Sequence, residues 1–314
     1  MSKFKKKWIF QFVRFLGIAL FVIILLRVDL KEISKSILRA NLNFLLIGVA
    51  FQILVLLFKA IRWHLMNNGR REWKYKALSY GRFFESYAIG IVTPARMGEV
   101  IKAGHETGKQ NIFNAGIRVL AERGIDIGIF VALAGLSVLA GYYLEVSPAY
   151  GWLITCIGTA VVLISMVILT SSKAIGLMLA LLKKLPGKWD DLTARGIAYH
   201  RNTTFLIILL SFASNVSYFV SCYFLSKSAG VDAGFIWVTG AVAVSGLLNM
   251  LPVTIMGLGT RELVFLYVFK SIATQNIILT FSFLMLLVAQ IGGGLLALVA
   301  GQVLLLKTKK YSYD

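Results

Sequence analysis

Four arginines and four acidic residues of this 314-residue chain lie within otherwise apolar stretches. An ionisable side chain near the centre of a bilayer is costly, so such residues usually face the interior of a helix bundle or a water-filled cavity. Their formal charges cancel, which predicts that they pair with one another. The eight residues are Arg96, Arg118, Arg123, Arg261, Glu99, Glu122, Asp126 and Glu262.

The spacing of these residues predicts which of them share a helical face. Arg96 and Glu99 are three residues apart, a separation at which helical side chains meet. Glu122 lies four residues from both Arg118 and Asp126, which gives the same kind of contact. We therefore expect ion pairs within each segment.

Two kinds of site fit this set of charges. In the first, a buried network of ion pairs only fixes how the helices pack. In the second, a polar cavity binds a charged headgroup, because the planar guanidinium of arginine can hold two oxygens of a phosphate at once. The residues expected to bind the phosphate are Arg96, Lys102, Arg123 and Arg261. The residues expected to hold these cations, or to carry a coupling proton, are Glu99, Glu122, Asp126 and Glu262.

Two positions of individual side chains are also predicted. Lys102 lies just beyond Glu99, and we expect it near the cytoplasmic mouth of the cavity. Arg261 is expected to pair with Glu99 or Asp126, because the adjacent Glu262 points to a different face of the helix.

The composition places these residues in a membrane protein. Hydrophobic residues make up 58% of the chain and charged residues 15%, with a mean hydropathy of +0.78, whereas about a quarter of a soluble domain is charged. This composition excludes a cytosolic enzyme, a disordered tail and a disulfide scaffold. The net charge of +19 would suggest nucleic acid in a soluble protein, but not in one this apolar. Motifs for metal hydrolysis or nucleotide binding do not occur, so neither a metal nor a cofactor is expected.

Six runs are long enough to cross a bilayer as helices, which takes about 20 apolar residues. The first has no small-residue cleavage site after it, so we expect a retained helix and not a signal peptide. A further stretch, Ala174–Leu185, predicts an interfacial amphipathic helix. The six predicted spans are Trp8–Leu26, Leu42–Phe58 (extendable to Trp63), Ala115–Tyr143, Tyr150–Thr170, Thr203–Ser226 and Ser271–Leu306, the last entering the membrane near Asn276.

Two more apolar segments, Phe83–His105 and Phe235–Phe269, are interrupted and predict re-entrant hairpins. Irregular backbone is tolerated at membrane depth only where protein or a water-filled cavity satisfies it. A helix kinked at proline is the alternative in each case. Helix ends freed at the two prolines would offer backbone N–H groups to an anion. The breaks are Thr93, Pro94 and Gly98 in the first segment and Pro252, Gly257 and Gly259 in the second.

The distribution of Lys and Arg predicts that both termini are cytoplasmic, because cytoplasmic loops are enriched in these residues. The predicted inside segments hold 22 of the 33 basic residues and the outside segments hold 6. Arg62, at the end of the second span, is included among the inside residues as an interfacial side chain.

The order of elements, span, span, hairpin and span, occurs twice with opposite orientation. This predicts an inverted-topology repeat of residues 1–143 and 150–306, joined by a cytoplasmic linker over 171–202, in a single membrane domain of residues 1–314. In transporters, interrupted segments at matching positions of two halves mark a binding site near the midplane.

The ordered motifs, from Thr93-Pro94-Ala95-Arg96-Met97-Gly98-Glu99 through Glu122-Arg123 to Leu251-Pro252 and Gly257-Leu258-Gly259-Thr260-Arg261-Glu262, resemble the lysylphosphatidylglycerol synthase transmembrane family, also called the flippase-like domain family. In that family the multiple peptide resistance factor joins such a membrane region, which moves a lipid to the outer leaflet, to a soluble aminoacyl-transferase domain. Here the chain ends eight residues after the last predicted span, so we do not expect the transferase domain.

We therefore expect a multi-pass protein of the cytoplasmic membrane that translocates an anionic lipid, either a phospholipid or a polyprenyl-phosphate-linked sugar. The alternatives are a membrane-embedded transferase that modifies a lipid and an accessory partner of a lipid-linked glycosyltransferase. The expected partners are membrane lipids and, in the last case, that glycosyltransferase; nucleic acid is not expected.

Overall fold

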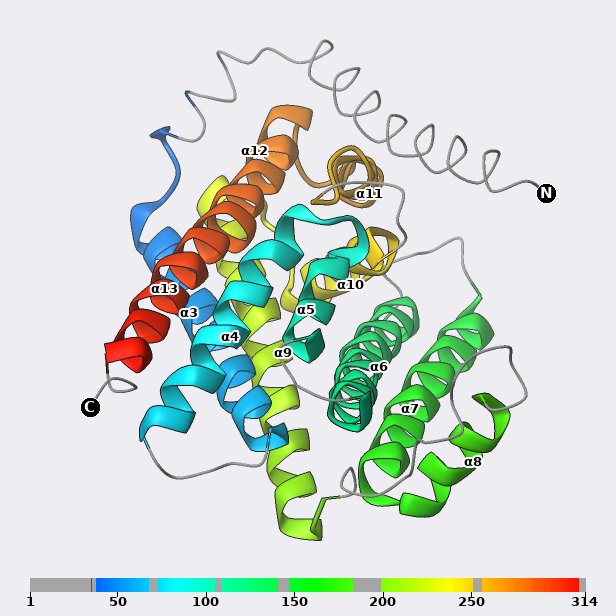
Figure 1. The fold of residues 1–314 in the computed structure, drawn as a ribbon. Coiled ribbons are helices and arrows are strands. Elements are labelled where there is room, and N and C mark those ends of the chain that lie inside the picture. The colour runs from blue at the N-terminus through cyan, green and yellow to red at the C-terminus, as the bar shows by residue number, and fades with distance from the viewer. Residues whose placement is uncertain are drawn as a thin grey trace, which may run out of the picture.

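The computed structural model describes residue 35 and residues 38–67, 73–104, 109–140, 147–182, 199–250 and 256–310. Within these ranges all regular structure is helical (Figure 1), as expected for an all-α polytopic membrane protein. Four helical stretches there are long and apolar enough to cross a bilayer. They are α3 (Leu42–Met66), α7 (Pro148–Thr170), α9 (Arg201–Ala229) and the stretch Gln275–Thr308. The span predicted over Trp8–Leu26 lies outside the described residues.

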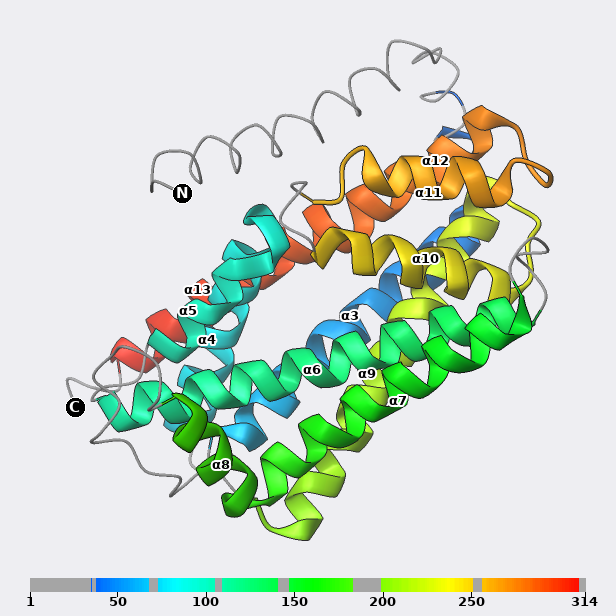
Figure 2. The same cartoon turned by 90° about the vertical axis from the view of Figure 1, so that its right-hand side faces the viewer.

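The helix α6 (Lys109–Leu139) is as long as a span but carries four charged residues in its first half. It packs between α7 and α10, as Figure 2 shows. Glycines make the contact with α7 close: a Cβ atom on Gly158 would lie 2.3 Å from the backbone nitrogen of Ala132. Small residues of this kind let the backbones of membrane helices approach each other, and here they hold the charged helix against its neighbour.

The first hairpin consists of α4 (Trp73–Val92), the 3₁₀ helix η1 (Pro94–Val100) and the short α5 (Ile101–Gly104). Thr93 fixes the break, because its hydroxyl donates to the carbonyl of Gly90 and accepts from the N–H of Gly98 at 2.7 Å. A Cβ atom on Gly98 would lie 2.8 Å from the backbone of Ile89 on α4. The chain therefore turns back along α4 and is not a kinked helix, and its first arm begins ten residues before the predicted start at Phe83.

The second hairpin consists of α10 (Phe235–Met250) and α11 (Thr260–Phe269), which pack against each other. Gly257 and Gly259 have φ angles of 71° and 84°, in the left-handed region that glycine adopts without strain. The break at these two positions is thus confirmed, whereas Pro252 lies outside the described residues.

The last span is continuous but not uniform. It begins as α12 (Gln275–Met285), passes through a π-helical segment, η2 (Leu286–Gly292), and ends as α13 (Gly293–Lys310). Such π segments inside α-helices are frequent at functional sites. The helix α8 (Ser172–Leu182) confirms the helix predicted over Ala174–Leu185 and begins two residues earlier, whereas residues 183–185 lie outside the described residues.

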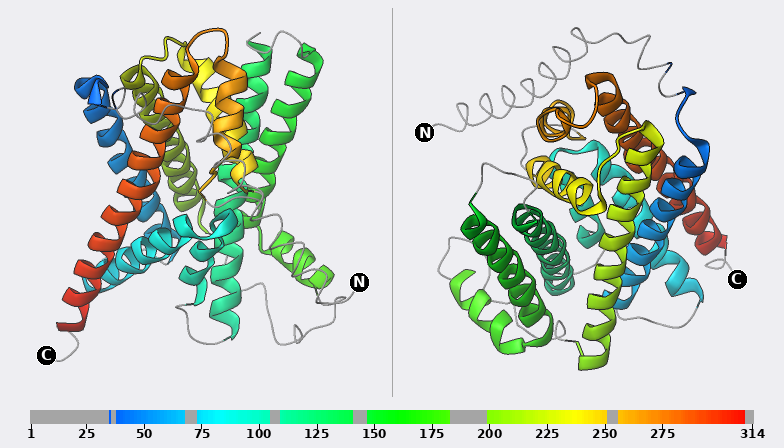
Figure 3. Two further views of the ribbon diagram at one scale, coloured as in Figure 1. Left: turned by 90° about the horizontal axis from the view of Figure 1, so that it is seen from above. Right: turned by 180° about the vertical axis from the view of Figure 1, so that it is seen from behind.

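Three helix pairs build the core around the two hairpins. The helices α3 and α9 run side by side, α4 packs along α13, and α6 packs along α10 (Figure 3). The face of α9 toward α3 carries both small and large side chains: the hydroxyl of Ser221 donates to the carbonyl of Gly48 at 2.7 Å, and the ring of Phe224 stacks on that of Phe51. The break of the first hairpin lies against the first arm of the second hairpin, where η1 contacts α10.

Candidate functional site

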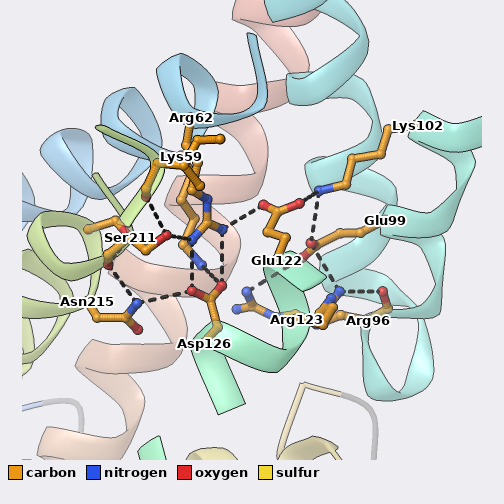
Figure 4. Close-up of polar contacts among 12 residues, drawn as sticks. Lys59, Arg62, Arg96, Glu99, Lys102, Glu122, Arg123, Asp126, Ser211 and Asn215 are labelled. Atoms are coloured by element: carbon orange, nitrogen blue, oxygen red, sulfur yellow. Dashed lines mark hydrogen bonds and ion pairs between the residues drawn. The ribbon is translucent and has the colours of Figure 1, made fainter. Parts of the chain in front are cut away.

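The eight charged residues predicted for the site fall into two separate clusters. The larger one joins α3, η1, α5, α6 and α9 and is drawn in Figure 4. The smaller one joins α11 to α12. The sequence had treated them as a single network.

Arg62 of α3 is the centre of the larger cluster. Its guanidinium donates to Glu122 at 2.6 Å and to both oxygens of Asp126 at 2.9 and 3.2 Å, and also to Ser211 of α9 at 2.9 Å. The side chain has no exposed surface. The prediction of an interfacial Arg62 is therefore wrong, because α3 continues to Met66 and the side chain points into the bundle, where two carboxylates compensate its charge.

Lys102 of α5 is also buried in the larger cluster. Its ammonium pairs with Glu122 and lies 4.6 Å from the centre of the Trp63 ring, with 1% of the side chain exposed. The expectation that Lys102 lies at an open mouth is wrong, since the return arm of the first hairpin carries it inward against α3. Arg62, Lys102 and Glu122, called the inner network below, have side chains at most 4% exposed.

Three further cations of the larger cluster are partly exposed. Arg123 pairs with Glu99 at 3.0 Å, while Arg96 lies 3.8 Å from the same carboxylate. The exposed fractions of the Arg96 and Arg123 side chains are 27% and 22%. Lys59, one turn before Arg62 on α3, pairs with Asp126 at 3.3 Å and is 17% exposed.

Sequence reasoning missed Lys59 and Asn215 and misplaced the partner of Arg118. Asn215 donates to Asp126 at 3.1 Å from α9, and Arg118 donates to Asn67 at 3.2 Å. Lys59 was counted as a cytoplasmic loop charge because it follows the apolar run of α3. The polar stretch of α9 around Asn215 was the available signal for a buried site.

The larger cluster carries an excess of two positive charges. It contains five cations and three carboxylates, all of them ion-paired with one another. The cations are Lys59, Arg62, Arg96, Lys102 and Arg123, and the carboxylates are Glu99, Glu122 and Asp126.

A central cavity opens beside this cluster, between the two hairpins. Its internal volume is about 90 Å³, enough for several water-sized groups, and it is partly open to the surroundings. The lining comes from α3, α4, η1, α6, α9, α10 and η2, and all its charged residues lie on α3, η1 and α6. The charged lining residues are Lys59, Arg96, Glu99, Arg123 and Asp126. The uncharged polar lining residues are Tyr87, Asn215, Tyr218, Asn249 and Gln290.

Each hairpin break holds one strained residue. Arg96 and Met256, with φ of 52° and 55°, are the non-glycine residues with positive φ in the part of the chain that is described. The carbonyl of Arg96 accepts from Arg123 at 2.9 Å, and that of Met256 accepts from Gln290 at 3.0 Å. Backbone strain of this kind is frequent at ligand-binding sites and switches. In both hairpins, the carbonyl of the strained residue accepts a hydrogen bond from a side chain of the span that follows the hairpin.

The smaller cluster is balanced and lies outside the cavity lining. Arg261 donates to Glu262 at 2.8 Å and to Ser282 of α12 at 2.7 Å. The predicted pairing of Arg261 with Glu99 or Asp126 is therefore wrong. Glu262 bends back to accept from the N–H of Gly259 at 2.7 Å, which brings its other oxygen to Arg261.

The comparison with protein families confirms the resemblance seen in the motifs. The family model described as the lysylphosphatidylglycerol synthase TM region matches residues 12–298, a range that includes both clusters and both hairpins. No curated protein matches the chain significantly. Over the described ranges, no three His, Cys, Asp or Glu side chains are grouped as a metal site would require.

Proposed function

The chain belongs to the lysylphosphatidylglycerol synthase transmembrane family, and from this premise we propose that it translocates an anionic lipid across the cytoplasmic membrane. The observation that carries the proposal is the excess of two positive charges beside a cavity in a helix bundle of membrane-spanning length. Uncompensated positive charge is costly within a membrane. The phosphate of an anionic lipid is an anion that the bilayer itself supplies.

The depth of the cavity supports translocation over surface binding. Asn215 lies 14 residues from each end of α9 (Arg201–Ala229), which is about 21 Å at the helical rise of about 1.5 Å per residue. Asp126 lies 17 residues from the start of α6 and 13 from its end. A headgroup beside these two residues would be about halfway through a bilayer core of about 30 Å.

In the proposed mechanism, the partly exposed cations Lys59, Arg96 and Arg123 bind the phosphate. Guanidinium groups suit this task because they hold two phosphate oxygens at once. Glu99 and Asp126 form ion pairs with these cations and so hold them in place. When the phosphate binds, the cations interact with it as well as with the two carboxylates. The inner network fixes the frame, and the acyl chains stay in the bilayer while the headgroup crosses.

The packing of the helices supports an inverted repeat as the basis of alternating access. In such a repeat, α3 corresponds to α9, α4 to α10, and α6 to the last span. The contact of α4 with α13 then matches the contact of α10 with α6, and the contact of α3 with α9 matches itself. The two held carbonyls obey the same correspondence, since Arg123 holds Arg96 as Gln290 holds Met256. Releasing one contact and keeping the other would open the cavity to one side of the membrane.

The charges of the loops support the orientation with both termini cytoplasmic. Lys59, Arg62 and Lys102 are part of the buried cluster, so they no longer count as loop residues. Removing these three leaves 19 basic residues in the inside segments against 6 outside. The positive-inside rule therefore still favours this orientation.

The proposal is tested by reconstituting the purified protein in vesicles with a fluorescent analogue of phosphatidylglycerol. The protein should increase the rate at which the probe reaches the opposite leaflet, while mass spectrometry shows the lipid chemically unchanged. A new covalent lipid product without a change of sidedness would favour a membrane-embedded transferase instead.

A further inference from the structure

We propose that the central cavity selects a lipid phosphate whose remaining headgroup is uncharged and hydroxylated, and that it rejects headgroups bearing a free amine. This inference rests on the proposed function and narrows its substrate class. The expected substrate therefore differs from lysylphosphatidylglycerol, the aminoacylated lipid in the name of the family.

The carboxylates beside the cavity have no capacity left for an amine. Asp126 already binds Arg62, Lys59 and Asn215. Glu99 is shared by Arg123 at 3.0 Å and by two more distant cations at 3.8 and 3.9 Å.

Glu122, behind them, is held by Arg62 and Lys102 and does not line the cavity. An amine would have to displace one of these cations from its acid.

The overall charge opposes an amine for the same reason. The larger cluster already has two positive charges in excess, and the single negative charge of a lipid phosphodiester would lower that excess to one. A lysyl ester of phosphatidylglycerol adds two ammonium groups to its single phosphate, so it would increase the positive charge. Juxtaposed like charges are strongly unfavourable where water is scarce.

The uncharged part of the lining matches hydroxyl groups. Asn249 and Gln290 carry amides and Tyr218 a phenol, each able to donate and to accept a hydrogen bond, as a hydroxyl group does. The amide nitrogen of Gln290 is bound to the carbonyl of Met256, which leaves its oxygen as the acceptor on that side chain. A glycerol or a sugar on the phosphate supplies hydroxyls for this part of the cavity.

Binding in detergent tests the selectivity without requiring transport. Three lipids with the same short acyl chains are compared: phosphatidylglycerol, its lysyl ester, and a sugar phosphate carried on the same tail. We expect phosphatidylglycerol and the sugar phosphate, which carry no amine, to bind at least about tenfold more tightly than the lysyl ester. The ratio between glycerol and sugar identifies which hydroxylated head fits better.

A single substitution should reverse the selectivity. Asn249→Asp replaces an amide by a carboxylate of nearly the same shape in the part of the cavity lining that α10 supplies. It should lower the ratio of the affinity for phosphatidylglycerol to that for the lysyl ester at least about tenfold. Asn249→Ser, which stays neutral, is the matched control: it adds no carboxylate and should not raise the affinity for the lysyl ester. Thermal unfolding of both variants verifies that they are folded.

Equal or tighter binding of the lysyl ester by the unsubstituted protein would overturn the inference, whether or not the variants fold. An unchanged preference in a folded Asn249→Asp variant would also overturn it. If selectivity is found but no lipid moves in vesicles, the inference about the cavity stands and the proposed translocation fails. If both lipids bind and move equally well, translocation stands and the inference fails.

Discussion

Arg62→Met should destabilise the protein far more than Lys59→Met, although the two residues lie one turn apart on α3 and share Asp126 as a partner. Arg62 is fully buried and donates four hydrogen bonds, three of them to carboxylates. Removing one partner of a buried ion pair typically costs about 3–5 kcal/mol. Glu122 keeps Lys102 and Asp126 keeps Lys59, so we expect about 3 kcal/mol, the lower end of that range.

Lys59→Met is the matched control for this substitution. The Lys59 side chain is 17% exposed and makes one contact, at 3.3 Å. Losing this one ion pair of a partly exposed side chain should cost clearly less stability than losing the four hydrogen bonds of the fully buried Arg62. The free energy of unfolding of both variants is measured in mixed micelles, alongside lipid movement in vesicles. We expect Lys59→Met to fold normally and to move lipid slowly.

Two results would refute this reasoning. An Arg62→Met variant as stable as the unsubstituted protein would mean that the inner network does not hold the fold. Equal destabilisation by the two substitutions would remove the distinction between buried frame and cavity-facing cations on which the mechanism depends.

Three further predictions follow from the packing and the charges. Gly158→Leu should cost about 2–3 kcal/mol of unfolding free energy, because α6 and α7 must separate to accept a side chain; an unfolding curve like that of the unsubstituted protein would contradict this. Arg261→Met alone should cost about 3–5 kcal/mol, whereas Arg261→Met with Glu262→Gln should regain most of that stability and still move lipid; a stable but inactive double variant would place Arg261 in the binding site. Cysteine at Ser147 should react with an impermeant thiol reagent on intact cells and cysteine at Lys74 should not; the reverse pattern would invert the proposed topology.

The elements that follow from local pattern could be predicted from the sequence. Four spans were found from length and hydropathy alone. The break at Thr93 and the breaks at Gly257 and Gly259 were found because proline and glycine leave few other conformations open. These features depend on residues that are neighbours in the chain.

The partners of the charged side chains could not be predicted in the same way. Arg62 ends an apolar run, and a cation there looks the same whether it points to the interface or into the bundle. Its direction is decided by acids on α6, about 60 residues further along the chain. Arg261 and Glu262 meet because Ser282 and the N–H of Gly259 hold them together. The capping contact of Glu262 with Gly259 is local and was readable from the sequence, but Ser282 lies 21 residues from Arg261 and its contact was not.

The proposed mechanism requires that the cavity-facing cations bind the phosphate of the lipid that crosses the membrane. The most direct measurement is the initial rate of phosphatidylglycerol movement in vesicles for the double variant Arg96→Gln/Arg123→Gln, in preparations shown by unfolding to be folded. Glutamine keeps a hydrogen-bond donor at both positions while removing the charge. We expect a rate at least about tenfold lower than that of the unsubstituted protein. A folded double variant that moves the lipid at the unsubstituted rate would contradict it.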